Sequence, residues 1–166
     1  MVEKNKGFLY IMVLFAIIII SIMMLKIFES WEYLVDRDKE AELIFRGEQI
    51  VNAITLYNRK KGAFPKTLEE LYKNKYLRKL YKDPLSGNGE WNIVSLPKRA
   101  GKEKFVVIPY SLWKSFKGSY RIVGVVSSIH KKAYKIYKEK EYYDEWLFAY
   151  GIKDKIPPFI VLGKEK

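Results

Sequence analysis

The run FLYIMVLFAIIIISIMML, residues 8–25, decides the fold of this chain. It is apolar throughout except for Tyr10 and Ser21, and the first charge after it is Lys26. About 18 residues at a helical rise of about 1.5 Å come close to the span of a hydrocarbon core, which needs about 20. The segment is therefore expected to be a membrane anchor, a signal or an assembly surface.

Seven residues, MVEKNKG, precede this run and form a short polar leader with two lysines. Lys26 is the one cation among the ten residues after the run, where Glu29 and Glu32 also lie. The distribution of Lys and Arg predicts a single pass with the amino terminus in the cytoplasm and the remainder outside. No small-residue cleavage site of the A-x-A kind follows the run, so the segment is expected to be retained.

The composition limits what the remaining residues can do. The chain has 166 residues, of which about 140 follow the apolar run, enough for one modest domain with its own core. It has no cysteine, which excludes disulfides, thiolate metal sites and cysteine nucleophiles. The single histidine, His130, leaves no histidine cluster for a metal. No cofactor and no metal site are therefore expected.

The chain is strongly basic, with 31 Lys and Arg against 19 Asp and Glu and a formal net charge of +12. Such a balance favours anionic partners such as nucleic acid or a lipid surface. The basic groups lie in separate stretches of the sequence: Arg59-Lys60-Lys61, Lys98-Arg99, Lys131-Lys132 and Lys138. Two interpretations stay open, a solvated surface and a binding surface, and the scatter favours the first.

Helical patterning continues beyond the apolar run through residues 26–61. From Glu29 to Lys61 there is no proline and one glycine, Gly47, which is read as a kink, a close-packing point or a tolerated solvent-side residue. Apolar residues recur mostly three or four apart, at Trp31, Leu34, Val35, Ala41, Ile44, Phe45, Val51, Ile54 and Tyr57. The pattern predicts one helix from Phe8 to about Lys61 whose second part packs one stripe against a domain.

Residues 62–90 read as a helical loop region. Gly62 is a plausible residue for ending the long helix, and Pro65 lies close behind it. Thr67 and Glu70 make a capping-box pattern for a short helix. Asp83-Pro84, followed by Ser-Gly-Asn-Gly, predicts a turn that shapes the loop; a contact with another subunit is the alternative.

Residues 91–166 have the composition of strands. Four strands are expected, at 91–96, 105–108, 120–129 with Gly124 as a candidate bulge, and 146–150. Residues 131–140 are read as a hairpin extension or a short helix, and 159–162 as an added edge strand. The order predicts an α+β fold in which a long N-terminal helix, its first part transmembrane, packs on a small antiparallel β domain.

Nothing in the sequence assembles a nucleophile, a base and an orienting group, so no enzyme activity is expected. His130 has no obvious partner and reads as a surface residue. Asp144-Glu145 reads as a solvated acidic pair, and Gly87-Asn88-Gly89 is too short for a phosphate-binding loop.

The amino-terminal residues carry a resemblance to a known family. A basic leader that ends in Lys6-Gly7, followed by Phe8 and a long apolar helix, resembles the class III signal of type IV pilins and type II secretion pseudopilins. Pseudopilins commonly carry Y-x-x-x-x-G-x-x-P after the helix, and this chain has Tyr57, Gly62 and Pro65 at that spacing.

The residues that follow are similar in order to those of the major pseudopilins. A Thr-Leu-Glu-Glu-Leu helix comes first, then Tyr76-Leu77 and Lys82-Asp83-Pro84. The resemblance covers residues 4–90, and the strands offer no motif of the family. It implies a pilin-like fold, in which residues 1–7 are the leader, 8–25 the filament-core helix, 26–61 its amphipathic continuation, 62–90 the helical loop region and 91–166 the β domain.

The resemblance also implies a function. A prepilin peptidase would cut after Gly7 and methylate Phe8, and the helix would anchor the chain in the bacterial inner membrane before it polymerises into a periplasmic pseudopilus. The implied partners are other pilin or pseudopilin subunits, the prepilin peptidase, the inner-membrane assembly platform and the lipid bilayer. The residues implied in the membrane and in assembly are Phe8, Leu9, Met12, Val13, Ala16, Ile17, Ile20 and Trp31, the last as an interfacial anchor or a helix-packing residue.

One position departs from the family pattern. The fifth residue of the processed chain is usually a glutamate, and here it is Met12. The departure is read as a minor or tip subunit, or as assembly through apolar packing alone. The carboxyl end lacks the acidic calcium-binding loop of the major pseudopilins, so no calcium site is carried over. The alternative function is a single-pass membrane protein whose basic outer domain binds an anionic partner such as DNA.

Overall fold

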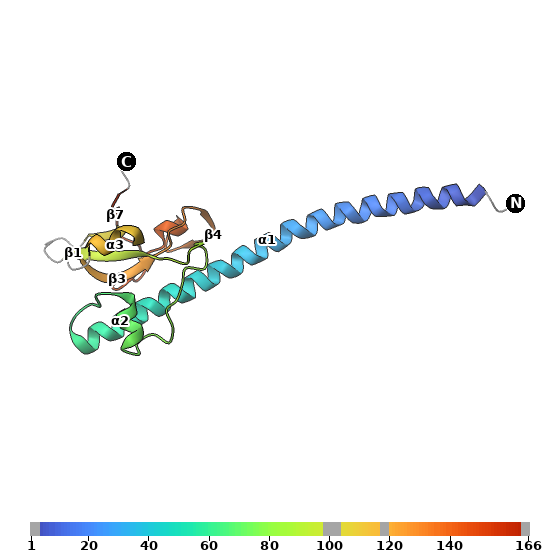
Figure 1. Cartoon of the computed structure of the whole chain (residues 1–166). Coiled ribbons are helices and arrows are strands. Elements are labelled where there is room, and N and C mark those ends of the chain that lie inside the picture. The colour runs from blue at the N-terminus through green and yellow to red at the C-terminus, as the bar shows by residue number, and fades with distance from the viewer. Residues whose placement is uncertain (1–3, 98–103, 117–119, 164–166) are drawn as a thin grey trace. The chain divides into compact units, whose positions relative to one another are not determined.

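A computed structural model of the chain describes residues 4–97, 104–116 and 120–163, without the side chains of residues 4–6, 27–33, 97 and 114. The chain divides into two compact units, Met1–Asp38 and Lys39–Lys166, and each is described here by itself. The helix α1 (Lys4–Lys61) contributes its residues up to Asp38 to the first unit and the rest to the second. Figure 1 shows α1 and the labelled elements of the second unit.

The first unit is helical from Lys4 onward. The helix was expected to begin at Phe8, and it begins within the leader because Lys4–Lys6 are residues that a helix accommodates and a single glycine is tolerated. The hydroxyl of Ser21 donates a hydrogen bond of 2.8 Å to the carbonyl oxygen of Ile17, one turn earlier. The polar group inside the apolar run is therefore satisfied within the helix itself.

The carboxyl end of α1 confirms the role expected for Gly62. Gly62 has a φ of +65°, and its N–H donates to the carbonyl oxygen of Asn58 at 2.8 Å. This left-handed conformation ends the helix and favours glycine. The last turn holds Arg59, Lys60 and Lys61, whose charges interact favourably with the negative end of the helix dipole.

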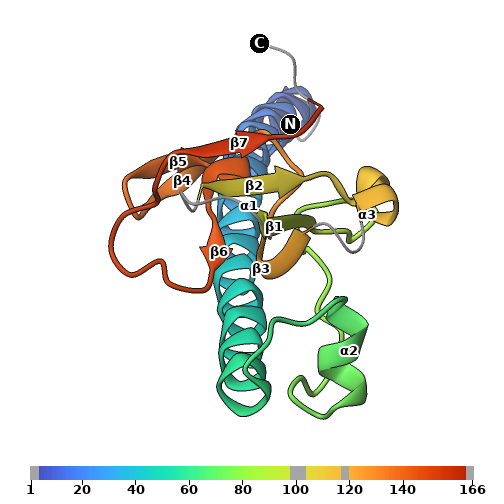
Figure 2. The same cartoon turned by 90° about the vertical axis from the view of Figure 1, so that its left-hand side faces the viewer.

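The short helix α2 (Leu68–Lys73) begins at the predicted cap. The side-chain oxygen of Thr67 accepts a hydrogen bond from the N–H of Glu70 at 3.2 Å. The Glu70 carboxylate accepts the N–H of Lys66 at 2.9 Å, one residue earlier than in a standard capping box. Figures 1 and 2 both place α2 beside the carboxyl end of α1.

A five-stranded sheet forms the centre of the second unit and confirms a small, mostly antiparallel sheet in an α+β layout. Its strand order is β6-β3-β1-β2-β7, and only the edge pair β2–β7 is parallel. The strands are β1 (Asn92–Pro97), β2 (Phe105–Ile108), β3 (Tyr120–Val126), β6 (Phe148–Ala149) and β7 (Phe159–Val161). The predicted edge strand near residues 159–162 is thus confirmed, although it pairs in parallel.

Residues 131–142 form a hairpin, which decides between the two readings of that segment. Its strands are β4 (Lys132–Tyr137) and β5 (Lys140–Tyr142), and Lys138 and Glu139 make the turn at φ values of +47° and +67°. The strand expected at 146–150 is reduced to the two residues of β6, because the 3₁₀ helix η1 (Tyr143–Glu145) and the turn after Ala149 occupy its flanks. The helix α3 (Tyr110–Phe116) was not expected from the sequence.

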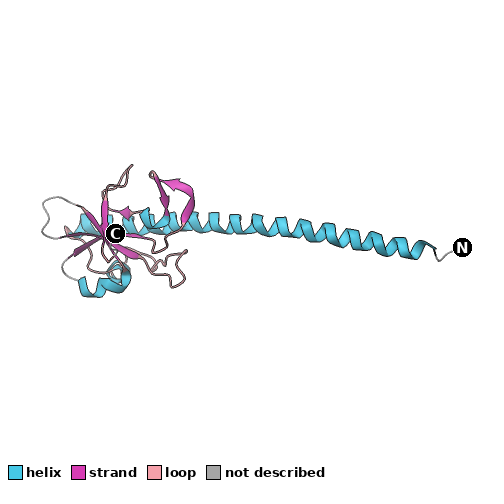
Figure 3. Ribbon diagram, turned by 90° about the horizontal axis from the view of Figure 1, so that it is seen from above, coloured by secondary structure: helices cyan, strands magenta, loops and turns pink. Residues whose placement is uncertain are grey.

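Both faces of the sheet are buried. One apolar cluster includes Ile93 and Ile108, and the other includes their neighbours Val94 and Val107, as alternation along a strand requires. The pairing of β1 with β3 slips by one residue at Val123, next to Gly124, so the bulge expected near Gly124 is present. Figures 2 and 3 show the sheet lying across the carboxyl-terminal part of α1.

The buried stripe of α1 differs from the predicted one. Ile54 and Tyr57 are buried, and Ile44 and Val51 are half-buried against the core, as expected, but Leu34, Val35, Ala41 and Phe45 are exposed. The residues that are buried at three- and four-residue spacing are Glu40, Leu43, Gly47, Ile50, Ala53, Ile54 and Tyr57. The prediction is thus confirmed in part. It missed Glu40 and Gly47 because a count of large apolar residues passes over a carboxylate and a glycine.

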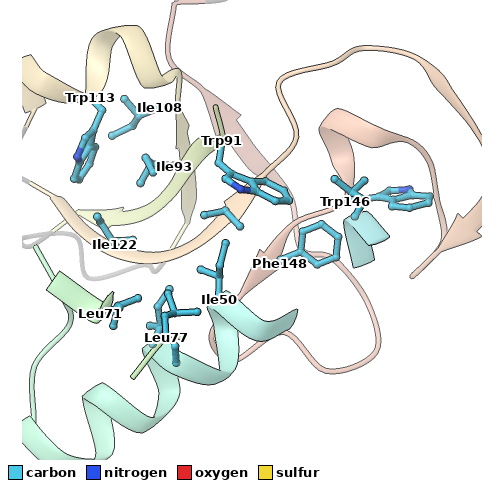
Figure 4. Packing of buried hydrophobic residues seen from close by; sticks show 14 of the residues in the cluster. Ile50, Leu71, Leu77, Trp91, Ile93, Ile108, Trp113, Ile122, Trp146 and Phe148 are labelled. Atoms are coloured by element: carbon cyan, nitrogen blue, oxygen red, sulfur yellow. The ribbon is translucent and has the colours of Figure 1, made fainter. Parts of the chain in front are cut away.

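Gly47 is a close-packing point, which resolves its three readings. A Cβ on Gly47 would lie 2.4 Å from Cγ of Phe148 in β6. The Phe148 ring cannot easily retreat, since it packs against the rings of Trp91 and Tyr137 at centroid distances of 6.3 and 5.3 Å. Figure 4 shows Phe148 among the large side chains that join α1 to the sheet.

Glu40 joins α1 to the hairpin. Its side chain is fully buried, and one carboxylate oxygen, Oε1, accepts the N–H of Tyr134 at 2.6 Å and the hydroxyl of Tyr143 at 2.7 Å. A buried carboxylate is stable only when such donors replace water. The sequence signal that could have revealed it is its position, three residues before Leu43 on the buried stripe.

We expect Gly47→Ala to lower the free energy of unfolding by about 1–3 kcal/mol, because overpacking against Phe148 outweighs the better helix propensity of alanine. The measurement is thermal and denaturant unfolding of the full chain in non-ionic detergent micelles. The matched control is Gly87→Ala, because a Cβ there meets nothing within 4 Å. Equal stability of the two variants would contradict the close-packing role of Gly47.

Candidate functional site

The most prominent surface of the first unit is its apolar helical segment, Gly7–Lys26. These 20 residues have a mean hydropathy of 3.0, and none of them is buried. By length and composition the segment is able to cross a membrane. A helix that is apolar on every face requires an apolar environment, which a lipid bilayer or a bundle of similar helices provides.

The residues expected in the membrane and in assembly fall within one half of the helix circumference, at 3.6 residues per turn. Phe8 is 67% exposed and Ile17, near the middle, is 54% exposed, so no face is covered within the unit. The other expected residues are exposed in the same way: Leu9, Met12, Val13, Ala16 and Ile20. The side chains of Lys6 and Trp31 lie outside the described part of the chain, so their expected roles stay predictions.

Gly7 lies inside α1, and the fold gives no reason for a glycine there. A Cβ at this position would meet nothing within 4 Å, and its backbone is not left-handed. Glycine in a helix costs about 1 kcal/mol relative to alanine. Its presence directly before Phe8 is therefore unexplained by packing, unlike that of Gly47.

The Tyr57, Gly62 and Pro65 pattern builds a defined corner after α1. The Tyr57 hydroxyl donates to Glu70 Oε1 at 2.5 Å, and the rings of Tyr57 and Tyr76 meet edge to face at 5.3 Å. The hydrogen bond to Glu70 is the main cause that raises the pKa of Tyr57 to about 12, and it lowers the pKa of Glu70. Pro65 is buried. The pattern thus connects the long helix, its turn and the cap of α2.

Asp83 shapes its loop, as the sequence predicts, and also ties that loop to the sheet. Its Oδ1 accepts the N–H of Leu85 at 2.9 Å, and its Oδ2 accepts the hydroxyl of Ser127, just after β3, at 2.7 Å. Asp83 is 2% exposed, so a direct role of its side chain in contacting another subunit is not favoured. Pro84 is half-buried beside it.

His130 and Asp144, which were expected to be separate surface residues, lie together at the base of the hairpin, and His130 is exposed as expected. Nδ1 of His130 lies 2.8 Å from Oδ2 of Asp144, and the imidazole stacks on the ring of Tyr142 at 4.8 Å. The expectation that His130 has no partner was wrong, because η1 folds back onto the base of the hairpin. Asp144 is largely buried rather than solvated, with a side chain 18% exposed.

One cavity of about 210 Å³ lies between α1 and the hairpin. Glu48, Asn52, Tyr137 and Lys138 are its polar lining residues, and the amine of Lys138 already donates to the carbonyl oxygen of Ile152 at 3.2 Å. Burial, with the Glu48 carboxylate as a second cause, raises the pKa of Tyr137 to about 12. Among the described residues, no three His, Asp or Glu side chains converge as a metal site.

Comparisons of the chain with protein-family models, with curated proteins and with solved structures found no match.

We expect Tyr57→Phe to lower the free energy of unfolding by about 1–2 kcal/mol near neutral pH, because the variant leaves Glu70 without its hydroxyl donor. Because the pKa of Tyr57 is raised, its hydrogen bond to Glu70 stabilises the fold fully below about pH 10. This stabilisation is lost as the pH rises toward 12. The lowered pKa of Glu70 has the opposite sign, so the contribution also fades as the pH falls below 4.5.

Denaturant unfolding of both proteins from acid to alkaline pH is the measurement. Tyr76→Phe is the matched control, since its ring lies beside Tyr57 and its hydroxyl makes no hydrogen bond in the described part of the chain. A stability difference that does not shrink at either extreme of pH would contradict the proposed pair.

Proposed function

We propose that the chain is a structural subunit of a pilin-like filament, a pseudopilin of a type II secretion system or a related type IV pilus-like assembly. The observation that carries the proposal is the helical segment Gly7–Lys26, apolar on every side and with no residue buried within its unit. Such a segment can rest in a bilayer as a monomer and later in the core of a helical filament with little change in its apolar surroundings.

Gly7 supports the processing step of this proposal. The fold does not require a glycine at this position, whereas the pilin-like signal requires one directly before the new amino terminus. Cleavage after Gly7 would remove the polar leader and place Phe8 at the start of the apolar segment. Phe8 is 67% exposed, so its side chain is not buried within the unit.

The second unit supports a structural role. The α+β layout, with a mostly antiparallel sheet across the carboxyl-terminal part of a long helix, is compatible with a pilin-like fold. The residues that carry the resemblance also have structural roles. Gly62 ends the long helix, and Tyr57 binds Glu70 of α2. In this proposal the unit lies in the periplasm of a bacterium, and its partners are further subunits, the prepilin peptidase and the assembly platform of the inner membrane.

Met12 adds a condition to the proposal. No carboxylate stands in the segment Phe8–Leu25, so neighbouring amino termini find no charged partner there. A carboxylate in lipid would be costly without a partner, and its absence removes both the cost and the pairing. Assembly in this proposal therefore rests on apolar packing of the helices, or the chain takes a minor position such as the tip.

We expect the membrane-extracted chain, from cells with an active prepilin peptidase, to begin at Phe8 and to carry one added methyl group, as measured by intact-mass and peptide mass spectrometry. Gly7→Val should leave the chain uncut, while Gly87→Val, a glycine with equally open surroundings, should be processed normally. An intact Met1 in the parent chain under these conditions would refute the proposal.

We also expect a head-to-tail contact between copies, which a cysteine-free chain allows to be tested cleanly. Ile20→Cys combined in turn with Leu9→Cys, Val13→Cys or Ala16→Cys should give a ladder of oxidised multimers from one of the pairs. Each single variant should give no ladder, because a head-to-tail contact joins two different positions. Dimers alone, formed equally by the single variants, would indicate a two-fold pair in place of a filament.

A further inference from the structure

Only one of the two units of the chain has a net positive charge. Met1–Asp38 holds 4 Lys and Arg against 5 Asp and Glu, whereas Lys39–Lys166 holds 27 against 14. The basicity is therefore a property of the second unit and has no direct connection with membrane orientation. The place of these charges on the folded unit decides whether they are a solvated surface or a binding surface.

Six basic residues gather where α1 ends beside α2, and we call this surface the basic end. Figures 1 and 2 both show the two helices side by side there. Its members are all exposed: Arg59, Lys60, Lys61, Lys66, Lys73 and Lys75. The sequence places them in three short stretches, and the turn at Gly62 with the cap of α2 brings the stretches together.

Two lysines of the basic end are held by aromatic rings. The amine of Lys60 lies 5.7 Å from the centre of the Tyr76 ring, and that of Lys61 lies 4.9 Å from the centre of the Tyr57 ring. The two rings contact each other edge to face. Cation–π contacts of this kind restrict the lysine side chains. Less side-chain entropy is therefore lost when these amines bind an anion.

The carboxylates near the basic end offset part of its charge. Glu70 accepts the Tyr57 hydroxyl and the Lys66 backbone N–H, and its charge also attracts Lys61 and Lys66. In the described part of the chain, none of the six cations forms an ion pair. Glu69 is the other acidic residue of this surface. Six cations against these two carboxylates leave the basic end with a surplus of four positive charges.

The hairpin provides a contrast within the same unit. Lys132 pairs with Glu141 at 2.9 Å, Lys140 with Glu145 at 3.3 Å, and Lys155, after β6, with Glu139 at 2.7 Å. These three contacts are ordinary surface ion pairs of the kind found on a solvated face. The basic end has six cations, and among the described residues none of them forms such a pair.

We propose that the basic end binds the phosphate backbone of nucleic acid. A group of exposed Lys and Arg side chains with a surplus of positive charge suits a polymer that carries one phosphate charge about every 1.7 Å of duplex axis, and several contacts form at once. Tyr72 on α2 is 49% exposed, so its ring is accessible to an unpaired base that stacks on it. The contacts are to phosphate and to π-faces, so the binding does not depend on base sequence.

This inference goes beyond filament assembly and is independent of it. The filament proposal rests on Gly7–Lys26 in the first unit, and the basic end lies wholly in the second. A correctly processed chain that fails to bind nucleic acid would leave the filament proposal intact. An unprocessed chain that binds nucleic acid would leave the proposal for the basic end intact.

The test is fluorescence anisotropy of a labelled DNA duplex, and of one of its strands, titrated with the full chain in non-ionic detergent micelles. The parent chain should lose about 10³-fold in affinity between about 50 and 200 mM salt if all six cations contact phosphates. A variant with Lys60, Lys61, Lys66 and Lys73 each changed to Gln should bind far more weakly at low salt. Its remaining salt dependence over the same range should be about 10-fold.

The matched control changes Lys132, Lys135, Lys153 and Lys155 to Gln, which removes an equal number of positive charges from exposed positions elsewhere on the unit. It should keep the affinity of the parent chain within about threefold and its full salt dependence. Thermal unfolding of both variants separates loss of binding from loss of folding. Weaker binding counts for the proposal when the basic-end variant and the control are both as stable as the parent chain.

Three outcomes would overturn the proposal. The first is no change in anisotropy at the lowest salt concentration, and the second is an equal loss of affinity in the two four-lysine variants. The third is displacement of DNA by polyglutamate at equal charge concentration, which would assign the surface to acidic polypeptides. In addition, Tyr72→Ala should weaken binding of the single strand several-fold and leave duplex binding unchanged.

Discussion

The contact between Gly47 and the ring of Phe148 is the constraint on which the second unit depends. It brings the backbone of α1 against β6, where a Cβ would stand 2.4 Å from the ring. At the other edge of β6 the backbone of β3 approaches as closely, since a Cβ on Gly124 would lie 2.0 Å from the carbonyl oxygen of Phe148. Two glycines therefore clamp a two-residue strand between helix and sheet. The apolar stripe of α1 contacts the core of the sheet because the helix backbone comes this close to the Phe148 ring.

Much of this architecture could be predicted, because the predictable elements rest on local chemistry. The helix end at Gly62, the cap at Thr67 and the strands at residues 92–97 and 105–108 depend on residues within a few positions of each other. The stripe of α1 could not be predicted in the same way. Its members Glu40 and Gly47 are buried only because Tyr143 and Phe148, about a hundred residues later, supply a donor and a ring. Tertiary contacts of this kind leave no local signal.

The features of the candidate site also differ in whether local sequence reveals them. The apolar segment and the glycine before Phe8 are visible in the sequence, because hydropathy and a leader pattern are local properties. The basic end is not visible there, since its lysines are separated by a turn and a cap and look scattered until the chain folds. The pairing of His130 with Asp144 was missed for the same reason, as η1 returns to the hairpin base only in the folded unit. Charge counts predicted a basic chain, and only the fold shows where the charge is concentrated.

The buried carboxylate of Glu40 has a consequence for how the second unit folds. Its two hydrogen bonds span 94 and 103 residues of the chain, so both close very long loops. Such loops lose chain entropy before their contacts form, and proteins rich in them fold in milliseconds to seconds. Helical turns in general form within about a microsecond, whereas the contacts of α1 with the hairpin and η1 require these long loops to close. Until then Leu43, Ile50 and Ile54 face water, and this interval is when the chain is most open to a wrong partner.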